Sequence, residues 1–210
     1  MKRALILDLD NTIYPISSIS EDLFAGILKV IDENSAHMPP QDVIDAKDDM
    51  TRRNFHLVAD TYNFGSQLKE KGISLLKEMT YTLPMQPFEG YEYVRAINLP
   101  KFLVTLGFTK LQWSKVKMLD IEADFAEIHI VDPELSTQTK KDVFAGIMNR
   151  HGYTADEVLV IGDDPESEIR AATALGIDTF LFDPENKHPY AEVTHRAKAL
   201  KAVELLLSQA

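Results

Sequence analysis

Cysteine is absent from this chain of 210 residues, and so is any long hydrophobic run. Without cysteine the protein can form neither disulfide bridges nor thiolate-bound metal sites, and a reducing compartment is permitted. No apolar run approaches the roughly 20 residues that are needed to cross a bilayer, and no signal peptide precedes the first strand-like segment. We therefore expect a cytoplasmic protein without a membrane partner.

Basic residues are also scarce. The chain has 22 lysines and arginines and 33 aspartates and glutamates, which gives a net charge of −11. Non-specific binding of nucleic acid requires a basic surface, so nucleic acid is not an expected partner. So acidic a protein can hold a phosphate group only where a metal ion, a lysine or backbone N–H groups reverse the local field. The composition thus directs attention to the few cationic groups near candidate sites.

The chain has room for one large domain, or for one domain with a small insert, and its hydrophobic fraction of 45% is typical of a globular protein. Five short apolar runs indicate buried strands, and helical patterns alternate with them from the second run onward. This alternation predicts an α/β fold with a Rossmann-like, parallel, five-stranded sheet and helices on both faces. The predicted strands lie at 3–7, 102–104, 128–131, 158–161 and 179–182, and the predicted helices at 110–119, 140–151, 166–175 and about 198–208.

One segment interrupts this alternation just after the first strand. Between Tyr14 and about Gln86 there is no strand-like run, and prolines punctuate both ends. Helical patterns instead cover 23–31, 41–54 and 66–80. The segment therefore predicts an inserted all-helical cap. The expected domains are a core of residues 1–14 and 87–210 and a cap of residues 15–86.

Asp8 and Asp10 follow the first predicted strand directly. In an extended chain, residues i and i+2 point the same way, so both carboxylates can converge at the sheet edge where ligands bind in open α/β folds. Two such carboxylates repel each other unless a cation or a shared proton is present. The pair therefore points to chemistry, although an acidic turn after a strand is the simpler structural alternative.

Further polar residues follow the later strands or begin the later helices. The hydroxyl of Thr105, at the end of the second strand, can bind a phosphate oxygen, although a lone threonine there is more often a turn former or helix cap. Lys140 and Lys141 begin a helix, where the helix dipole disfavours lysine. One of the two lysines can therefore have a functional role, but both can equally be ordinary lysines exposed to solvent.

The fourth strand ends in Gly-Asp-Asp, with Asp163 and Asp164 at its tip and Glu166 and Glu168 in the following turn. Acidic residues favour helix N-termini, which can account for the two glutamates but less well for the two aspartates. Three or more carboxylates at neighbouring strand ends suit Mg²⁺, which takes oxygen ligands and keeps waters that a substrate can replace. We therefore expect Mg²⁺ as the cofactor.

Together these motifs resemble those of the haloacid dehalogenase (HAD) superfamily of phosphohydrolases, and the resemblance covers the full chain, including the helical cap. The first and last motifs are highly specific, whereas the middle two are weak alone. The opening segment 8–15 is similar to the branch that contains pyrimidine 5′-nucleotidase-like enzymes. Lys140 is preferred to Lys141 because its spacing to Phe144 fits the family better. The matching segments are 8–12, 105–107, Lys140 and 162–168.

The resemblance implies a Mg²⁺-dependent phosphatase that hydrolyses a small phosphomonoester, a nucleotide or a sugar phosphate, through an aspartyl-phosphate on Asp8. It implies that Asp10 protonates the leaving oxygen and then activates water. Such covalent catalysis splits one displacement into two easier ones. The implied metal ligands are Asp8, Asp163 and the backbone carbonyl of Asp10, and the implied phosphate-binding residues are Thr105, Lys140 and Asn11.

The chain departs from the family pattern at two positions. Leu106 follows Thr105 where a small or polar residue is more usual, so this loop is expected to contact the substrate differently. Glu168 stands where the family has an aspartate and is one methylene longer. Either Glu168 binds the metal through water, or Asp164 does so.

Other functions stay open at this point. A protein that keeps the fold but only binds a phosphorylated metabolite would show no turnover with Mg²⁺. A haloacid dehalogenase would need no metal and would lack the second acidic residue, so Asp10 and Asp163 argue against it. A receiver domain has no cap and carries its phosphoacceptor elsewhere. A phosphonatase would need a cap lysine near the nucleophile, and the cap offers Lys29, Lys47, Lys69 and Lys71.

The cap is expected to set substrate choice, because it closes over the strand ends and excludes water. The expected partner is a small phosphorylated metabolite. The sequence identifies neither the leaving group nor the oligomeric state. Polar candidates for substrate contact, each of which can equally be an exposed helix residue, are Arg52, Arg53, His56, Tyr62 and Asn63.

Overall fold

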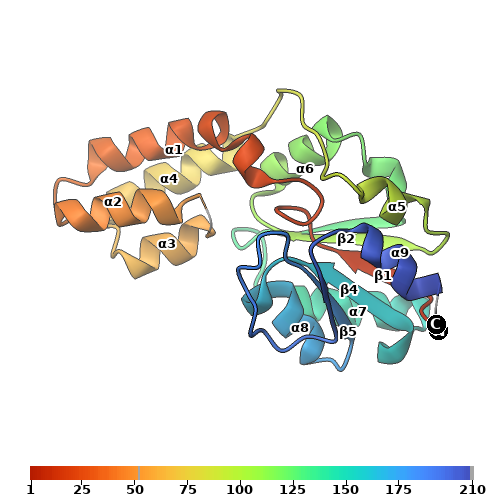
Figure 1. Cartoon of the computed structure of the whole chain (residues 1–210). Coiled ribbons are helices and arrows are strands. Elements are labelled where there is room, and N and C mark those ends of the chain that lie inside the picture. Colours follow the sequence, from red (N-terminus) through yellow and green to blue (C-terminus); the bar gives the residue numbers. More distant parts are fainter. Residues whose placement is uncertain (52, 209–210) are drawn as a thin grey trace.

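A computed structural model describes residues 1–51 and 53–208, and within them the chain forms one parallel sheet flanked by helices, with a separate group of helices at one side (Figure 1). The strand order is β3-β2-β1-β4-β5-β6, and every neighbouring pair is parallel. The strands are β1 (Ala4–Leu7), β2 (Lys101–Leu106), β3 (Glu127–Val131), β4 (Val158–Gly162), β5 (Asp178–Phe182) and β6 (His195–Ala197).

The apolar runs of the sequence become buried strands because helices cover both faces of the sheet. Leu5 and Leu7 of β1 point to one face, and Ala4 and Ile6 point to the other, as the alternation of a strand requires. Helices α5, α6 and α9 lie over the first face, and α7 and α8 lie over the second (Figure 1). These helices are α5 (Tyr91–Ala96), α6 (Thr109–Met118), α7 (Lys140–His151), α8 (Arg170–Thr173) and α9 (Lys201–Ser208).

The predicted α/β fold with a parallel sheet is confirmed, but the predicted number of strands was wrong. Across the described residues the sheet has six strands instead of five, because β6 pairs with β5 through registers such as Phe180 with His195. β6 has three residues, His195, Arg196 and Ala197, and none of them is fully buried. So short an edge strand carries no apolar run, and the sequence pattern therefore gives no signal for it.

Residues 16–78 contain four α-helices in their described part, and Figure 1 shows these helices beside the sheet. The helix predicted over 41–54 is shorter in the structure, because α2 ends at Asp49, and α3, which begins at Phe55, was not predicted. The Asn54 side chain caps α3 by accepting a hydrogen bond from the Leu57 N–H at 3.0 Å. Division into a core and a cap at residues 15 and 86 stays a prediction. The four helices are α1 (Ser20–Asn34), α2 (Pro40–Asp49), α3 (Phe55–Thr61) and α4 (Ser66–Glu78).

The loops that follow β1, β2 and β4 lie on the side of the sheet nearest α1–α4 (Figure 1). Polar residues at these strand ends therefore face the helical segment. Within residues 1–51 and 53–208, none of the helices combines the length and the apolar character that a transmembrane segment needs.

Candidate active site

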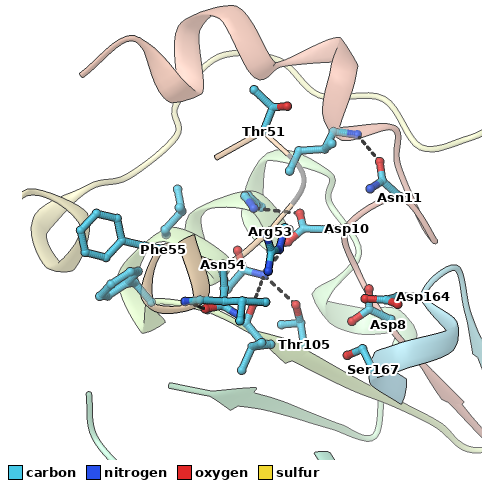
Figure 2. Close-up of a pocket in the computed structure, with 18 of the residues that line it drawn as sticks. Asp8, Asp10, Asn11, Thr51, Arg53, Asn54, Phe55, Thr105, Asp164 and Ser167 are labelled. Carbon is cyan, nitrogen blue, oxygen red and sulfur yellow. Dashed lines mark hydrogen bonds and ion pairs between the residues drawn. The ribbon is translucent and has the colours of Figure 1, made fainter. Parts of the chain in front are cut away.

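The site begins where β1 ends, because Asp8 follows Leu7 and remains tied to the sheet through its N–H, which donates to the Ile161 carbonyl at 3.0 Å. Asp8 is buried, with 6% of its surface exposed. Asp8 and Asp10 both line a cavity of about 260 Å³ between the strand ends and the α1–α4 segment. Figure 2 shows Thr105 and Asp164 on the strand side of this cavity and residues 53–55 on the other side.

Lys140 is the first residue of α7, and its side chain reaches back to the end of β1. Its Nζ lies 2.6 Å from Asp8 Oδ1 and 2.8 Å from Glu168 Oε2. A capping box between Thr139 and Asp142 begins the helix and adds a carboxylate to its first turn, which offsets the unfavourable position of a lysine there. Lys140 is buried, whereas Lys141 is exposed. The structure therefore brings Lys140, and not its neighbour, to Asp8.

Glu168 lies in a π-helical turn, Pro165–Ile169, which replaces the start of the helix predicted over 166–175. Its Oε1 accepts a hydrogen bond from the Asp164 N–H at 2.7 Å, and its Oε2 faces Lys140. The Glu168 side chain folds over Gly162, where any Cβ would overlap its carboxyl group. Both carboxylate oxygens of Glu168 thus have partners, one of which is Lys140. The methylene that glutamate has in addition to aspartate fits because residue 162 is a glycine.

Asp163 adds a further carboxylate, which accepts a hydrogen bond from Thr12 Oγ1 at 3.1 Å. Burial, followed by the charges of Glu168 and Asp8, raises its pKa well above the usual range. Burial also raises the pKa of Asp8 to about 7, in spite of the opposing charge of Lys140. The pKa of Asp164 is likewise raised by burial. This region therefore brings together more carboxyl groups than the single lysine beside them can balance if all of them are ionised.

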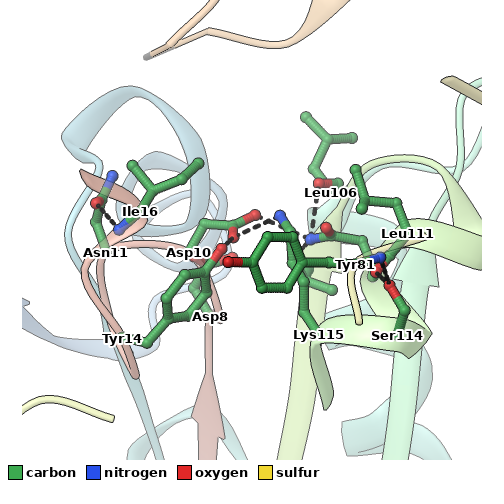
Figure 3. A network of polar contacts seen from close by, with 12 residues as sticks. Asp8, Asp10, Asn11, Tyr14, Ile16, Tyr81, Leu106, Leu111, Ser114 and Lys115 are labelled. Carbon is green, nitrogen blue, oxygen red and sulfur yellow. Dashed lines mark hydrogen bonds and ion pairs between the residues drawn. The ribbon is translucent and has the colours of Figure 1, made fainter. Parts of the chain in front are cut away.

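A second set of contacts surrounds Asp10. Figure 3 shows Tyr14 and Lys115 pointing toward it. Asp10 Oδ1 accepts hydrogen bonds from the Tyr14 hydroxyl and from Lys115 Nζ, the latter at 2.8 Å, and Oδ2 accepts one from Gln112 Nε2 at 3.0 Å. Burial opposes ionisation of Asp10, but the charge of Lys115 and these hydrogen bonds outweigh it, so its pKa is lowered. Asp10 is thus held as a carboxylate.

Sequence reasoning missed Gln112 and Lys115. Both lie on α6 and both are buried, at 1% and 3% exposure. The signal was present, because positions 112, 115, 116 and 119 form one helical face at i, i+3, i+4 and i+7. Two polar residues on a stripe shared with Val116 and Leu119 indicate a buried polar contact rather than a solvated face.

Thr105 and Asn11 also line the cavity. Thr105 is buried at the end of β2, and its Oγ1 accepts a hydrogen bond from Gln112 Nε2 at 2.6 Å. Asn11 adopts a left-handed backbone conformation with φ of 56°, and its Oδ1 accepts a hydrogen bond from the Ile16 N–H at 3.1 Å. Both residues therefore line the same cavity as the two aspartates, and their binding of phosphate stays a prediction.

The predicted specificity residues lie in different surroundings. Arg53 lines the cavity, although its guanidinium contacts Asp49 at 2.6 Å and Thr61 at 3.2 Å. Tyr62 donates to Asp49, and Asn63 forms a left-handed turn; neither lines the cavity. Arg52 lies outside the described residues.

His56 joins the helical segment to the loop after β3. Its Nε2 lies 2.8 Å from Glu134 Oε1, and its ring stacks on Phe108 with a centroid distance of 5.8 Å. Lys77 of α4 contacts the other oxygen of Glu134 at 2.8 Å. These contacts hold α3 and α4 against the strand side at the rim of the cavity.

The arrangement gives the cavity three chemical capacities. Asp8 is a buried carboxylate that can act as a nucleophile beside a lysine, and Asp10 is a second carboxylate that can exchange protons. Lys140 supplies positive charge for an anionic group. The excess of carboxylates around Asp163 provides oxygen ligands for a hard cation.

Comparison with known proteins agrees with this geometry. The sequence profile of the haloacid dehalogenase-like hydrolases matches residues 2–176. A ribulose-1,5-bisphosphate 5-phosphatase of Halopiger xanaduensis is 27% identical over 126 residues, which is 60% of this chain. The matched part spans only 49%, about half, of that relative's length.

A second relative and a solved structure match over most of their lengths. A glyceraldehyde 3-phosphate phosphatase of Methanopyrus kandleri is 23% identical over 195 residues, covering 85% of this chain and 83% of that protein. The structure of a haloacid dehalogenase-like family hydrolase from Streptococcus pneumoniae superposes with a TM-score of 0.72 at 17% identity, covering 100% of this chain and 99% of the other. At that identity the structure supports the fold alone.

Proposed function

Because the chain belongs to the haloacid dehalogenase-like hydrolases, we propose that it hydrolyses a small phosphomonoester through an aspartyl-phosphate on Asp8. The observation that carries this proposal is a pair of carboxylates at the end of β1, Asp8 buried and Asp10 half-buried, each with its own lysine. Asp8 lies 2.6 Å from Lys140, and Asp10 lies 2.8 Å from Lys115. Two carboxylates in different surroundings can take different roles in one reaction.

In the first step an Asp8 carboxylate oxygen attacks phosphorus, and the bond from phosphorus to the leaving oxygen breaks. The contacts of Asp10 favour its ionised form in the free protein, so Asp10 must take up a proton as the substrate binds, and it then gives this proton to the leaving oxygen. In the second step a water oxygen attacks the phosphorus, Asp10 takes a proton from this water, and the bond from phosphorus to Asp8 breaks. Lys140 and Thr105 bind the phosphoryl oxygens in both steps, and such positioning with charge stabilisation supplies most of the catalysis of phosphoryl transfer.

Mg²⁺ is the cofactor that this proposal includes, and the donors present fit it. Among the described residues no three acidic or histidine side chains form a metal cage as they stand. Mg²⁺ does not require one, because it is commonly held by one or two carboxylates, waters and substrate phosphate. Asp8, Asp163 and the Asp10 carbonyl would hold it. When bound, it would neutralise charge on the phosphoryl group and on the crowded carboxylates.

The alternative functions account for fewer of the contacts seen in the cavity. A dehalogenase would leave the Asp10 contacts without a purpose, and a protein that only binds phosphate would not need an ordered proton donor. A phosphonatase needs a cap lysine at the nucleophile. In the part of the chain that the structure describes, no cap lysine lines the cavity. Lys47, Lys69 and Lys71 instead contact Asp32, Asp60 and Asn34.

We further propose that residues 15–86 act as the cap that chooses the leaving group. The α1–α4 side of the cavity is largely apolar, with Leu23, Phe24, Phe55 and Leu76 among its lining residues. Both named relatives act on phosphorylated sugars or their small derivatives, which supports a small metabolite as the substrate. The similarity of segment 8–15 to pyrimidine 5′-nucleotidase-like enzymes keeps nucleotides in the candidate set. A screen of phosphorylated metabolites with Mg²⁺ tests the proposal directly.

Excess chelator is expected to lower hydrolysis of p-nitrophenyl phosphate by about 100-fold or more, because charge neutralisation by a divalent cation contributes several kcal/mol. Calorimetry should detect Mg²⁺ binding without substrate. This binding should weaken as the pH falls from about 8 to about 6, since protons compete for Asp8, whose pKa burial raises to about 7.

The matched variants for this prediction are Asp163→Asn and Asp156→Asn. The first removes a half-buried candidate ligand and should weaken Mg²⁺ binding by at least about tenfold. The second changes an exposed aspartate before β4 and should leave binding unchanged. Full activity in excess chelator would rule out the metal requirement.

A further inference from the structure

Helix α6 presents two buried polar residues, Gln112 and Lys115, to the end of β1. They are three residues apart and therefore lie on the same face of the helix. Leu111 and Val116 are buried beside them and already supply apolar packing for α6. A buried lysine loses much of its hydration, and an apolar residue of similar volume often packs as stably. The presence of Lys115 at this position thus calls for a role beyond packing.

The contacts of these two residues fix both oxygens of Asp10. Lys115 Nζ and the Tyr14 hydroxyl donate to Oδ1, while Gln112 Nε2 donates to Oδ2. A carboxylate held at one oxygen can still rotate about its χ2 angle, whereas one held at both cannot do so without breaking a hydrogen bond. The orientation of Asp10 is therefore set by donors from α6 and from the turn after β1.

Gln112 also ties Asp10 to Thr105. Its Nε2 donates to Thr105 Oγ1 at 2.6 Å as well as to Asp10 at 3.0 Å. Because the Thr105 oxygen serves as the acceptor in this contact, its own hydroxyl hydrogen is left to donate elsewhere. One side chain thereby positions a proton-exchanging group and a hydroxyl that faces the same cavity.

We propose that Gln112 and Lys115 are positioning residues that hold Asp10 in line with the leaving oxygen and aim the Thr105 hydroxyl at the phosphoryl group. This inference rests on the proposed phosphatase function. It gives α6 a role in the chemistry, although neither residue contacts the reacting atoms. Replacing either residue should therefore lower activity mainly on substrates whose leaving oxygen needs a proton.

The test compares Lys115→Met and Gln112→Met with wild type on two aryl esters of similar shape, p-nitrophenyl phosphate and phenyl phosphate. Phenolate is the poorer leaving group and depends more on proton transfer from Asp10. Misplacing a proton donor is expected to lower kcat/KM for phenyl phosphate by about 100-fold and for p-nitrophenyl phosphate by less than about tenfold. The comparison uses kcat/KM because this ratio reports the first step alone, whereas slower hydrolysis of the phosphoenzyme would lower kcat and KM together for both esters. Lys117→Met, on the exposed side of α6, is the matched control and should behave as wild type.

Equal losses on the two esters, or no loss, would overturn the inference, because a purely structural role would not depend on the leaving group. Thermal unfolding checks each variant, and Gln112→Met provides the comparison if Lys115→Met fails to fold. Wild-type protein that hydrolyses neither ester with Mg²⁺ would overturn the proposed function itself, and the inference with it. The two failures are therefore distinguishable before any variant is measured.

Discussion

Asp8→Asn is expected to abolish turnover, with a loss on the order of 10⁴-fold or more, as is typical when a covalent nucleophile is removed. The amide cannot form the acyl-phosphate bond that the first step requires. The substitution keeps the shape of the side chain and removes one of several crowded negative charges, so the variant should fold. Lys140 keeps its contact with Glu168 at 2.8 Å. The measurement is steady-state hydrolysis of p-nitrophenyl phosphate with Mg²⁺, together with a thermal unfolding curve.

Asp10→Asn serves as the comparison for this result. With p-nitrophenyl phosphate, whose leaving oxygen needs no proton, the variant should still transfer the phosphoryl group to Asp8. Hydrolysis of the phosphoenzyme should then be slow, at a loss of roughly 10²–10⁴-fold, because the attacking water has lost its base. Rapid-quench trapping of the phosphoenzyme measures this directly. Activity in Asp8→Asn combined with complete loss in Asp10→Asn would mean that the two roles are reversed.

Lys140→Met is expected to lower turnover by on the order of 10²–10³-fold, the usual effect of removing one electrostatic donor from a transition state. Lys140 lies between Asp8 and Glu168, and its removal leaves those carboxylates facing each other without a cation from the protein. Methionine keeps most of the volume of the side chain, so the loss of charge is separated from the loss of packing. Steady-state kinetics with Mg²⁺ provide the measurement.

Lys141→Met is the control for this prediction, because Lys141 is the next residue on α7 and is exposed. It should leave both activity and stability close to those of wild type. A large effect from Lys141 with a small one from Lys140 would contradict the geometry at the start of α7. Mild effects from both would mean that Thr105, backbone N–H groups and the metal hold the phosphate without a lysine.

The fold was largely predictable because its strands are buried on both faces and therefore appear as continuous apolar runs. The elements that escaped prediction are short. β6 contains three half-buried residues, and α5 (Tyr91–Ala96) has six residues, too few for a helical period to show. α3 (Phe55–Thr61), which Asn54 caps, has only seven residues and was also missed.

The candidate site was predictable to the extent that its residues stand at strand ends. Asp8, Thr105 and Asp163 follow from that rule, because parallel strands bring their carboxyl ends to one edge. Gln112 and Lys115 do not follow from it, since their contacts with Asp10 span 102 and 105 residues of sequence. Contacts of that kind depend on which side of the helix packs against the sheet. The sequence pattern indicates that side only through an occasional polar residue on an otherwise apolar helical face.

The close approach of Glu168 to Gly162 links two positions that evolution could otherwise vary independently. A side chain at 162 would displace the carboxyl group that supports Lys140, so it is compatible only with a shorter or differently turned residue at 168. Related sequences with glutamate at 168 should therefore keep glycine at 162, whereas a larger residue at 162 should occur only together with a shorter residue, such as aspartate, at 168. The two positions form a covarying pair that can sort close relatives of this chain from more distant ones.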